Sequence, residues 1–140
     1  MIDLAVVGIL VCENKTLLLH RTFAPICWTP PGGHVEANET LIDAVHREVY
    51  EETGIRCRII MPIDIWHGEH DAIPIESISF VCECDTSVVR LSNEHDDFRW
   101  VDIAEIENWK HATDFDVSKW DKFFKTAMLF KNLMGDTGYE

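Results

Sequence analysis

The segment from Gly32 to Ile55 constrains this chain more than any other stretch, because it joins a glycine turn to one strongly marked amphipathic helix. Thr40 is a suitable N-terminal cap with Asp43 three residues on as its capping-box partner, and Gly54 is a suitable left-handed stop. These signals predict a helix from Leu41 to Thr53. Its apolar residues recur at helical spacing and predict one buried stripe: Leu41, Ile42, Ala44, Val45 and Val49.

The polar side of this helix carries three acids near its C-terminal end. Glu48, Glu51 and Glu52 lie three and four residues apart, so their carboxylates are neighbours. The negative end of the helix dipole disfavours each acid by about 0.3–1 kcal/mol, and each like-charged pair costs roughly 0.2–0.5 kcal/mol more. Stability alone would favour lysine at these positions. The cluster therefore predicts a compensating cation, and hard oxygen ligands favour Mg²⁺ or Mn²⁺ over zinc.

The fixed residues of the segment follow a recognisable spacing. Five residues separate Gly33 from Glu39, and seven more precede Arg47-Glu48-Val49-Tyr50-Glu51-Glu52-Thr53-Gly54-Ile55. This pattern resembles the signature of the Nudix hydrolases at every fixed position, and Trp28-Thr29-Pro30-Pro31-Gly32-Gly33 resembles the start of that motif. The resemblance implies an α/β fold, an α/β/α sandwich with a mixed β-sheet between helices. We expect residues 1–140 to form a single Nudix domain.

The resemblance also implies which residues bind metal. Glu48, Glu51 and Glu52 would hold Mg²⁺, with Mn²⁺ as an alternative, helped by the carbonyl of Gly33. Glu51 and Glu52 would thereby also be catalytic. Glu39 is expected to support the loop and the helix.

Two further positions carry catalytic expectations. Arg47 resembles the family arginine that orients a catalytic glutamate. The base that accepts the proton of water would be Glu52 itself or a loop acid before the strand Phe98–Val101, where Glu94 is preferred over Asp97. An ordinary charged loop is the alternative interpretation of these last two acids.

Three residues upstream of the motif are candidate substrate ligands. Arg21 could reach a phosphate, although an ordinary surface ion pair is equally consistent with its position. Phe23 and Trp28 could stack on a base, but either could instead cover the core.

The formal net charge of −13 makes nucleic acid an improbable partner, because affinity for a phosphate backbone comes mostly from lysine and arginine. Five cysteines without CxxC spacing or a secretion signal argue against a disulfide framework or zinc site and favour a cytoplasmic location: Cys12, Cys27, Cys57, Cys82 and Cys84. The apolar run from Leu4 to Val11 is too short to span a membrane. Many Nudix proteins pair as dimers, so a homodimer is also consistent with the resemblance.

The remaining pattern predicts strands and one more helix. We expect a central strand at Ile2–Cys12 with a hairpin return at Thr16–Thr22, a solvated loop at His67–Ala72 and a helical turn at Asp102–Glu107. Further strands are predicted at 58–66, with Ile59, Met61, Ile63 and Ile65 on one face, and at 75–85, with Ile78, Phe80, Cys82 and Cys84 inward. A final helix, capped by Thr113 or Asp116, would bury Val117, Trp120, Phe124 and Ala127, and a frayed tail would follow from Met134 to Glu140.

These features together favour metal-dependent hydrolysis of a diphosphate linkage in a nucleoside diphosphate joined to another group. Nucleoside triphosphates or dinucleoside polyphosphates are the favoured substrates, by analogy with small MutT-like Nudix proteins. A sensor that binds a nucleotide or nucleotide sugar without hydrolysis is the main alternative, and a purely structural acidic helix is a third.

Overall fold

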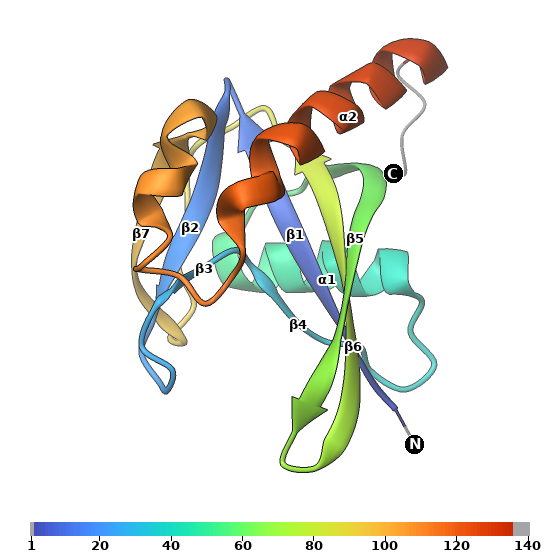
Figure 1. Ribbon diagram of the computed structural model, residues 1–140, viewed down its shortest axis with the longest axis vertical. Helices are drawn as coiled ribbons and strands as arrows, with labels where there is room; N and C mark the ends of the chain where they lie inside the picture. Colours follow the sequence, from blue (N-terminus) through green and yellow to red (C-terminus); the bar gives the residue numbers. More distant parts are fainter. Residues whose placement is uncertain (1, 136–140) are drawn as a thin grey trace.

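The computed structural model describes residues 2–135, which form one mixed β-sheet between helices (Figure 1). The strand order is β3 (Trp28–Thr29), β2 (Lys15–Arg21), β1 (Asp3–Cys12), β6 (Ile73–Glu83) and β5 (Arg58–His70). Two more strands complete the seven-stranded sheet: β4 (Gly32–His34) pairs with β1, and β7 (His95–Asp102) pairs with β2. β1 runs parallel to β6 and antiparallel to β2 and β4.

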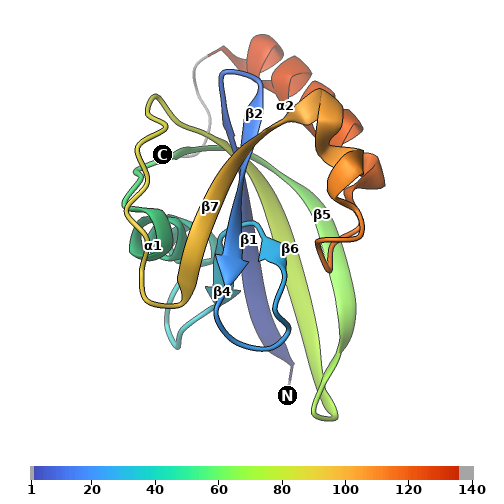
Figure 2. The same cartoon turned by 90° about the vertical axis from the view of Figure 1, so that its left-hand side faces the viewer.

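Helices cover both faces of this sheet, as Figure 2 shows. Helix α1 (Leu41–Thr53) packs on one face, where Val45 and Val49 join Val6, Leu10 and Phe80 in one apolar cluster. Helix α2 (Trp120–Met134) covers the other face with the short helices η1 (Ile103–Trp109) and η2 (Val117–Lys119). The predicted α/β/α sandwich with a mixed sheet is therefore confirmed.

Strand β1 lies at the centre of the molecule because both of its faces are apolar. Alternate residues enter the two clusters, with Val6 and Leu10 toward α1 and Val7 and Ile9 toward α2. Its predicted role as a central strand and the hairpin with β2 are both confirmed. The first half of β1, at residues 5–7, pairs with β4 and so holds the glycine turn against the sheet.

Helix α1 begins and ends at the predicted residues because its signals are local. The Thr40 hydroxyl accepts a hydrogen bond from the Asp43 amide at 3.0 Å. Gly54 adopts φ 74° and donates its amide to the Tyr50 carbonyl at 2.8 Å. These two caps set the position of every acid on the helix.

The β5–β6 hairpin differs from the prediction. The predicted solvated loop at His67–Ala72 is wrong, because β5 continues to His70 and pairs with β6 up to a turn at Asp71–Ala72. The predicted alternation is also wrong: a bulge at Ile59–Met61 leaves both Ile59 and Ile60 buried, and the side chain of Ile65 is exposed. Pro62 is tolerated here because β5 is an edge strand, and its register shifts after Pro62.

The C-terminal part follows the prediction more closely. The last strand is longer than predicted, starting at His95, so that Glu94 lies immediately before it. The helical turn at η1 and the inward faces of β6 and α2 are confirmed. Asp116 caps η2 through the Ser118 amide, whereas the Thr113 hydroxyl donates to Phe115. Most of the predicted tail, 136–140, lies outside the described residues, and Met134 is the last residue of α2.

Within residues 2–135, none of the helices combines the length and the apolar character needed to cross a membrane.

Candidate functional site

A cleft of about 730 Å³ lies where α1 approaches the glycine turn of β4. One wall carries Glu48, Glu51 and Glu52 from the polar face of α1, and Gly32–Gly33 forms the adjoining edge. The opposite wall comes from the end of β2 and from residues 92–95. The cleft therefore gathers three segments that are far apart in the sequence.

The glycine turn is in direct contact with the acids of the helix. Strand β4 pairs Gly33 with Val6 of the central strand, which holds the turn against the core. A Cβ atom added to Gly33 would lie 2.5 Å from the Glu48 carboxyl carbon, so any side chain there would displace that carboxylate. The backbone of Gly33 and the Glu48 carboxylate consequently line the same point of the cleft.

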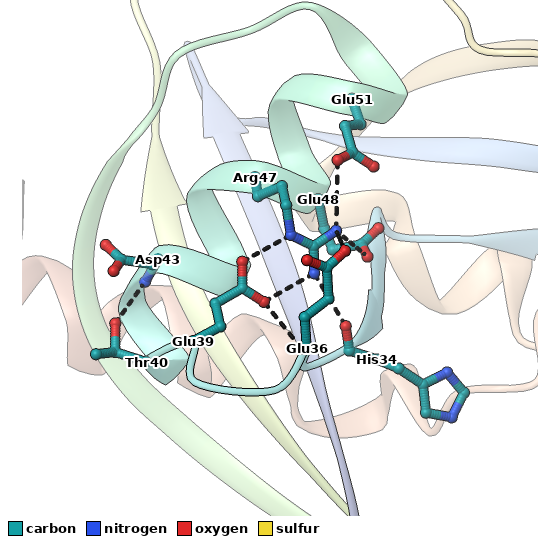
Figure 3. A network of polar contacts seen from close by, with 8 residues as sticks. All are labelled: His34, Glu36, Glu39, Thr40, Asp43, Arg47, Glu48 and Glu51. Carbon is teal, nitrogen blue, oxygen red and sulfur yellow. Dashed lines mark hydrogen bonds and ion pairs between the residues drawn. The ribbon is translucent and has the colours of Figure 1, made fainter.

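Arg47 organises the acids around this turn (Figure 3). Its Nε and Nη2 atoms donate to both carboxylate oxygens of Glu39, at 2.7 and 2.9 Å, and Nη2 also donates to the His34 carbonyl. Its Nη1 atom donates to Glu48 at 2.9 Å and to Glu51 at 3.4 Å. The hydrogen bonds from Arg47 lower the pKa of Glu39 to about 2.

Glu52 is the most enclosed acid of the cleft, with only 5% of its surface exposed. Its Oε1 atom accepts the Gly32 amide at 2.8 Å. The pKa of Glu52 is raised to about 8, chiefly because the carboxylate is buried. The Gly32 hydrogen bond opposes this shift, and the nearby charges of Glu48, Glu94 and Glu51 add to it. Burial also raises the pKa of Glu48, although Arg47 opposes that shift.

These residues fit a hard divalent cation by their chemistry. Carboxylates that repel one another beside a glycine turn are the donor set that Mg²⁺ and Mn²⁺ prefer. Among residues 2–135, no three acidic, histidine or cysteine side chains already converge as a finished metal cage. The hydrogen bonds account for this: Arg47 draws Glu48 and Glu51 to itself, and the Gly32 amide holds Glu52.

The two candidate loop acids have different positions. Glu94 lines the cleft, and its charge raises the pKa values of Glu48 and Glu52. Its carbonyl accepts both the amide and the hydroxyl of Thr22 at 3.0 Å, which ties its backbone to the end of β2. Asp97 lies outside the cleft, where it accepts the Phe98 amide and contacts Arg99.

The three candidate substrate ligands are not all brought together. Arg21 and Phe23 line the cleft, and the Arg21 guanidinium lies 4.1 Å from the centroid of the Phe23 ring. Trp28 does not line it. The Trp28 ring contacts His20 and Trp109 instead, with centroid distances of 5.0 and 5.4 Å. The structure thus places Trp28 as a packing residue, the alternative interpretation of the sequence.

The comparison with protein families decides what kind of domain carries this cleft. A family model described as the NUDIX domain matches residues 3–121. The chain belongs to the Nudix family. An ADP-ribose pyrophosphatase of Methanocaldococcus jannaschii is 48% identical over 133 residues, which cover 91% of this chain and 74% of that protein.

Other Nudix relatives are similar over shorter stretches or at lower identity. The human m7GpppN-mRNA hydrolase NUDT17 is 46% identical over 78 residues, 49% of this chain and 24% of that protein. The chain therefore spans about a quarter of the length of that relative. The crystal structure of a MutT protein from Methanosarcina mazei Go1 superimposes with a TM-score of 0.77 at 26% identity, covering 89% of this chain and 94% of the other.

This Nudix cleft also contains residues that sequence reasoning missed. His95, Ser92 and Asn93 line the cleft around Glu94, and Asp114 and Phe115 line it as well. His95 lies between Glu94 and Asp97, the two loop acids that the sequence analysis named as candidates. Nothing local marks Asp114 and Phe115, which reach the cleft only because of how the chain between η1 and η2 folds back.

Proposed function

We propose that this protein hydrolyses a diphosphate linkage in a nucleoside diphosphate joined to another group, with a divalent ion, Mg²⁺ or alternatively Mn²⁺. The observation that carries the proposal is that Glu48, Glu51 and the buried Glu52 line the same cleft of about 730 Å³, with Glu48 and Glu52 next to the glycine turn. Membership of the Nudix family supports it.

The glutamates would hold the metal together with the Gly33 carbonyl. A bound divalent ion in such a site acidifies water and neutralises charge on phosphate oxygens. Arg47 is a positioning residue: its contacts with Glu39 and the His34 carbonyl fix the guanidinium, which in turn orients Glu48 and Glu51. Glu39 stabilises this arrangement from outside the cleft.

One acid must accept the proton of the attacking water. Glu52 is the first candidate, because its carboxylate is enclosed, oriented by the Gly32 amide and surrounded by like charges that favour taking up a proton. Glu94 is the second, since it lines the opposite wall of the cleft. Water attacks phosphorus, the phosphoanhydride oxygen leaves with its half of the substrate, and the proton goes to the base.

The proposed substrates share a nucleoside diphosphate unit. Nucleoside triphosphates and dinucleoside polyphosphates are favoured by the sequence, and the names of the relatives add ADP-ribose and the mRNA cap. Each of these contains a phosphoanhydride next to a nucleoside. Arg21 and Phe23 are the proposed substrate contacts that the cleft offers.

A substrate panel tests the proposal. Nucleoside triphosphates, dinucleoside polyphosphates, ADP-ribose and a cap analogue are incubated with Mg²⁺ or with chelator, and products are separated by chromatography. We expect metal-dependent cleavage of at least one compound, lost in Glu52→Gln and retained in Glu69→Gln, whose side chain lies exposed on the β5–β6 hairpin. Nucleotide binding without cleavage anywhere in the panel would instead support the sensor alternative.

A further inference from the structure

Two nitrogen atoms in the wall opposite α1 are buried without a hydrogen-bond partner. Within the described chain, Nε of Arg21 and Nδ1 of His95 have neither a protein acceptor nor a donor. A buried polar group without a partner costs about 1–3 kcal/mol, so most such groups in native proteins have one. Such a pair indicates a ligand that supplies the absent contacts.

The fold places these two residues next to each other. Arg21 ends β2 and pairs directly with His95 at the start of β7, after a register shift that follows His20. Both residues line the cleft that contains the three glutamates. His95 is 94% buried, with 6% of its surface exposed, so its ring is fixed in the wall.

Neighbouring contacts hold the pair in this position. The Arg21 guanidinium rests on the Phe23 ring at 4.1 Å and donates Nη2 to the Ala24 carbonyl at 3.3 Å. Thr22 anchors the backbone next to His95 through two hydrogen bonds to the Glu94 carbonyl. These contacts hold the Arg21 side chain in place while its Nε atom has no hydrogen-bond partner.

The charge of the cleft determines which ligand fits. Arg21 is the only lysine or arginine among the described residues that line the cleft, and it faces an acidic wall across it. Glu94 lies beside His95 on the Arg21 side, and an anion bound at the Arg21 guanidinium gains a charge-assisted hydrogen bond there. The substrate of the proposed reaction carries such an anion, the second phosphate of its diphosphate unit.

We propose that Arg21 and His95 form a phosphate subsite that binds the phosphate next to the one held at the glutamate wall. This inference rests on the proposed function. Arg21 donates from Nε to an oxygen of this phosphate. His95 donates from Nδ1, which carries the hydrogen in the tautomer that this contact requires. The subsite selects ligands with at least two linked phosphates over nucleosides and over monophosphates held at the metal alone.

Binding of a non-hydrolysable ligand tests the subsite without relying on turnover. The affinity of α,β-methylene-ADP is measured by calorimetry in Mg²⁺ for wild type, Arg21→Lys, Arg21→Gln and His95→Phe. We expect each change to weaken binding about tenfold or more. His95→Phe removes a donor outright, and the two Arg21 variants replace the fixed Nε–H by a group that cannot donate from the same position. Adenosine affinity and the affinity for Mg²⁺ alone stay within about twofold, since neither ligand uses the subsite.

Matched controls lie on the same two strands. Arg99→Gln and His20→Asn remove an arginine and a histidine of β7 and β2 that lie outside the cleft, and both retain wild-type affinity for the analogue. Circular dichroism and melting temperature confirm that each variant folds.

A measurement on the unaltered protein covers the case in which His95→Phe fails to fold. Titration of ¹⁵N-histidine-labelled wild type with the analogue in Mg²⁺ shifts the Nδ1 resonance of His95, whereas adenosine does not. An unshifted resonance, or variants that bind the analogue as tightly as wild type, overturns the subsite and leaves the proposed hydrolysis standing. Failure of the hydrolysis panel with a subsite that behaves as expected leaves a diphosphate-binding cleft.

Discussion

Helices α1 and α2 differ in the charges that they place at their C-terminal ends, where the helix dipole is negative. α2 has Asp121 in its first turn and Lys131 in its last, so its charges follow the dipole. α1 has no basic residue in its last turn and carries Glu51 and Glu52 there instead. The difference teaches that the end of α1 gives up helix stability, as the proposed metal site requires, whereas α2 packs on the sheet with charges that favour the helix.

Removing the most enclosed acid of α1 is expected to have the largest effect. Glu52→Gln keeps the size of the side chain and its contact with the Gly32 amide but abolishes the negative charge. We expect kcat/KM to fall about 10²–10⁴-fold, the range typical of a lost acid–base group. Asp121→Asn, the matched change on α2, should leave steady-state kinetics unaltered. Equal losses in both variants would contradict the division between the helices.

A conservative change at Arg47 tests how much the acids depend on positioning. Arg47→Lys retains a positive charge but cannot span both oxygens of Glu39 and reach Glu48 at once. We expect turnover to fall about 10–100-fold, as is common when a residue that orients metal ligands is lost. The Mg²⁺ concentration for half-maximal activity should rise in parallel. A variant with normal metal dependence would show that Arg47 does not orient the glutamates.

The acids at the end of α1 should also affect the free energy of unfolding when no metal is present. Glu52 binds its proton more tightly when folded, with a pKa raised from 4.5 to about 8, so the folded state holds more protons than the unfolded state between these values. Its contribution therefore favours folding below pH 4.5 and is lost as the pH rises to about 8. In chelator at pH 8, Glu52→Gln should be more stable than wild type by roughly 1–3 kcal/mol in urea unfolding.

Adding Mg²⁺ should reverse that order. Wild type gains stability through the bound ion, by about 2.7 kcal/mol at a hundredfold excess over Kd, whereas Glu52→Gln gains less. A wild-type unfolding curve that Mg²⁺ leaves unchanged would speak for the purely structural acidic helix.

The smallest effect is expected on α2. Lys125 and Asp121 form an exposed ion pair at 2.8 Å with the spacing of one helical turn. Lys125→Ala should change the free energy of unfolding by no more than about 0.5 kcal/mol, with activity unaltered. A loss above about 1 kcal/mol in urea unfolding would mean that α2 depends on its surface charges more than this comparison allows.

What the sequence predicts well is what local signals determine. The bounds of α1 follow from Thr40 and Gly54, whose effects act within one turn of the helix, and the spacing of its acids follows from those bounds. The wrong prediction at His67–Ala72 has the opposite origin. That stretch is polar, but pairing with β6, which sets His67 opposite Glu76, makes it a strand.

The candidate site also has one part that local sequence predicts and one part that depends on distant contacts. The glutamate wall and Gly33 come from one continuous segment, so their proximity could be predicted from spacing. The opposite wall depends on contacts between distant strands, such as Arg21 with His95. The sequence could not decide between the two interpretations of Trp28, because its ring packs on Trp109, a residue far away in the chain.

The contacts of Arg47 have a consequence for protein engineering. The segment from His34 to Glu51 contains the cation Arg47, the acids that pair with Arg47, and Thr40, the cap that starts the helix. Such a segment is nearly a transplantable module: a recipient scaffold would have to provide a buried central strand to pair with Gly33 and an apolar surface for Val45 and Val49. Without Arg47, the transplanted carboxylates would repel one another before any metal arrived. A designer should therefore move the arginine and Glu39 together with the glutamates.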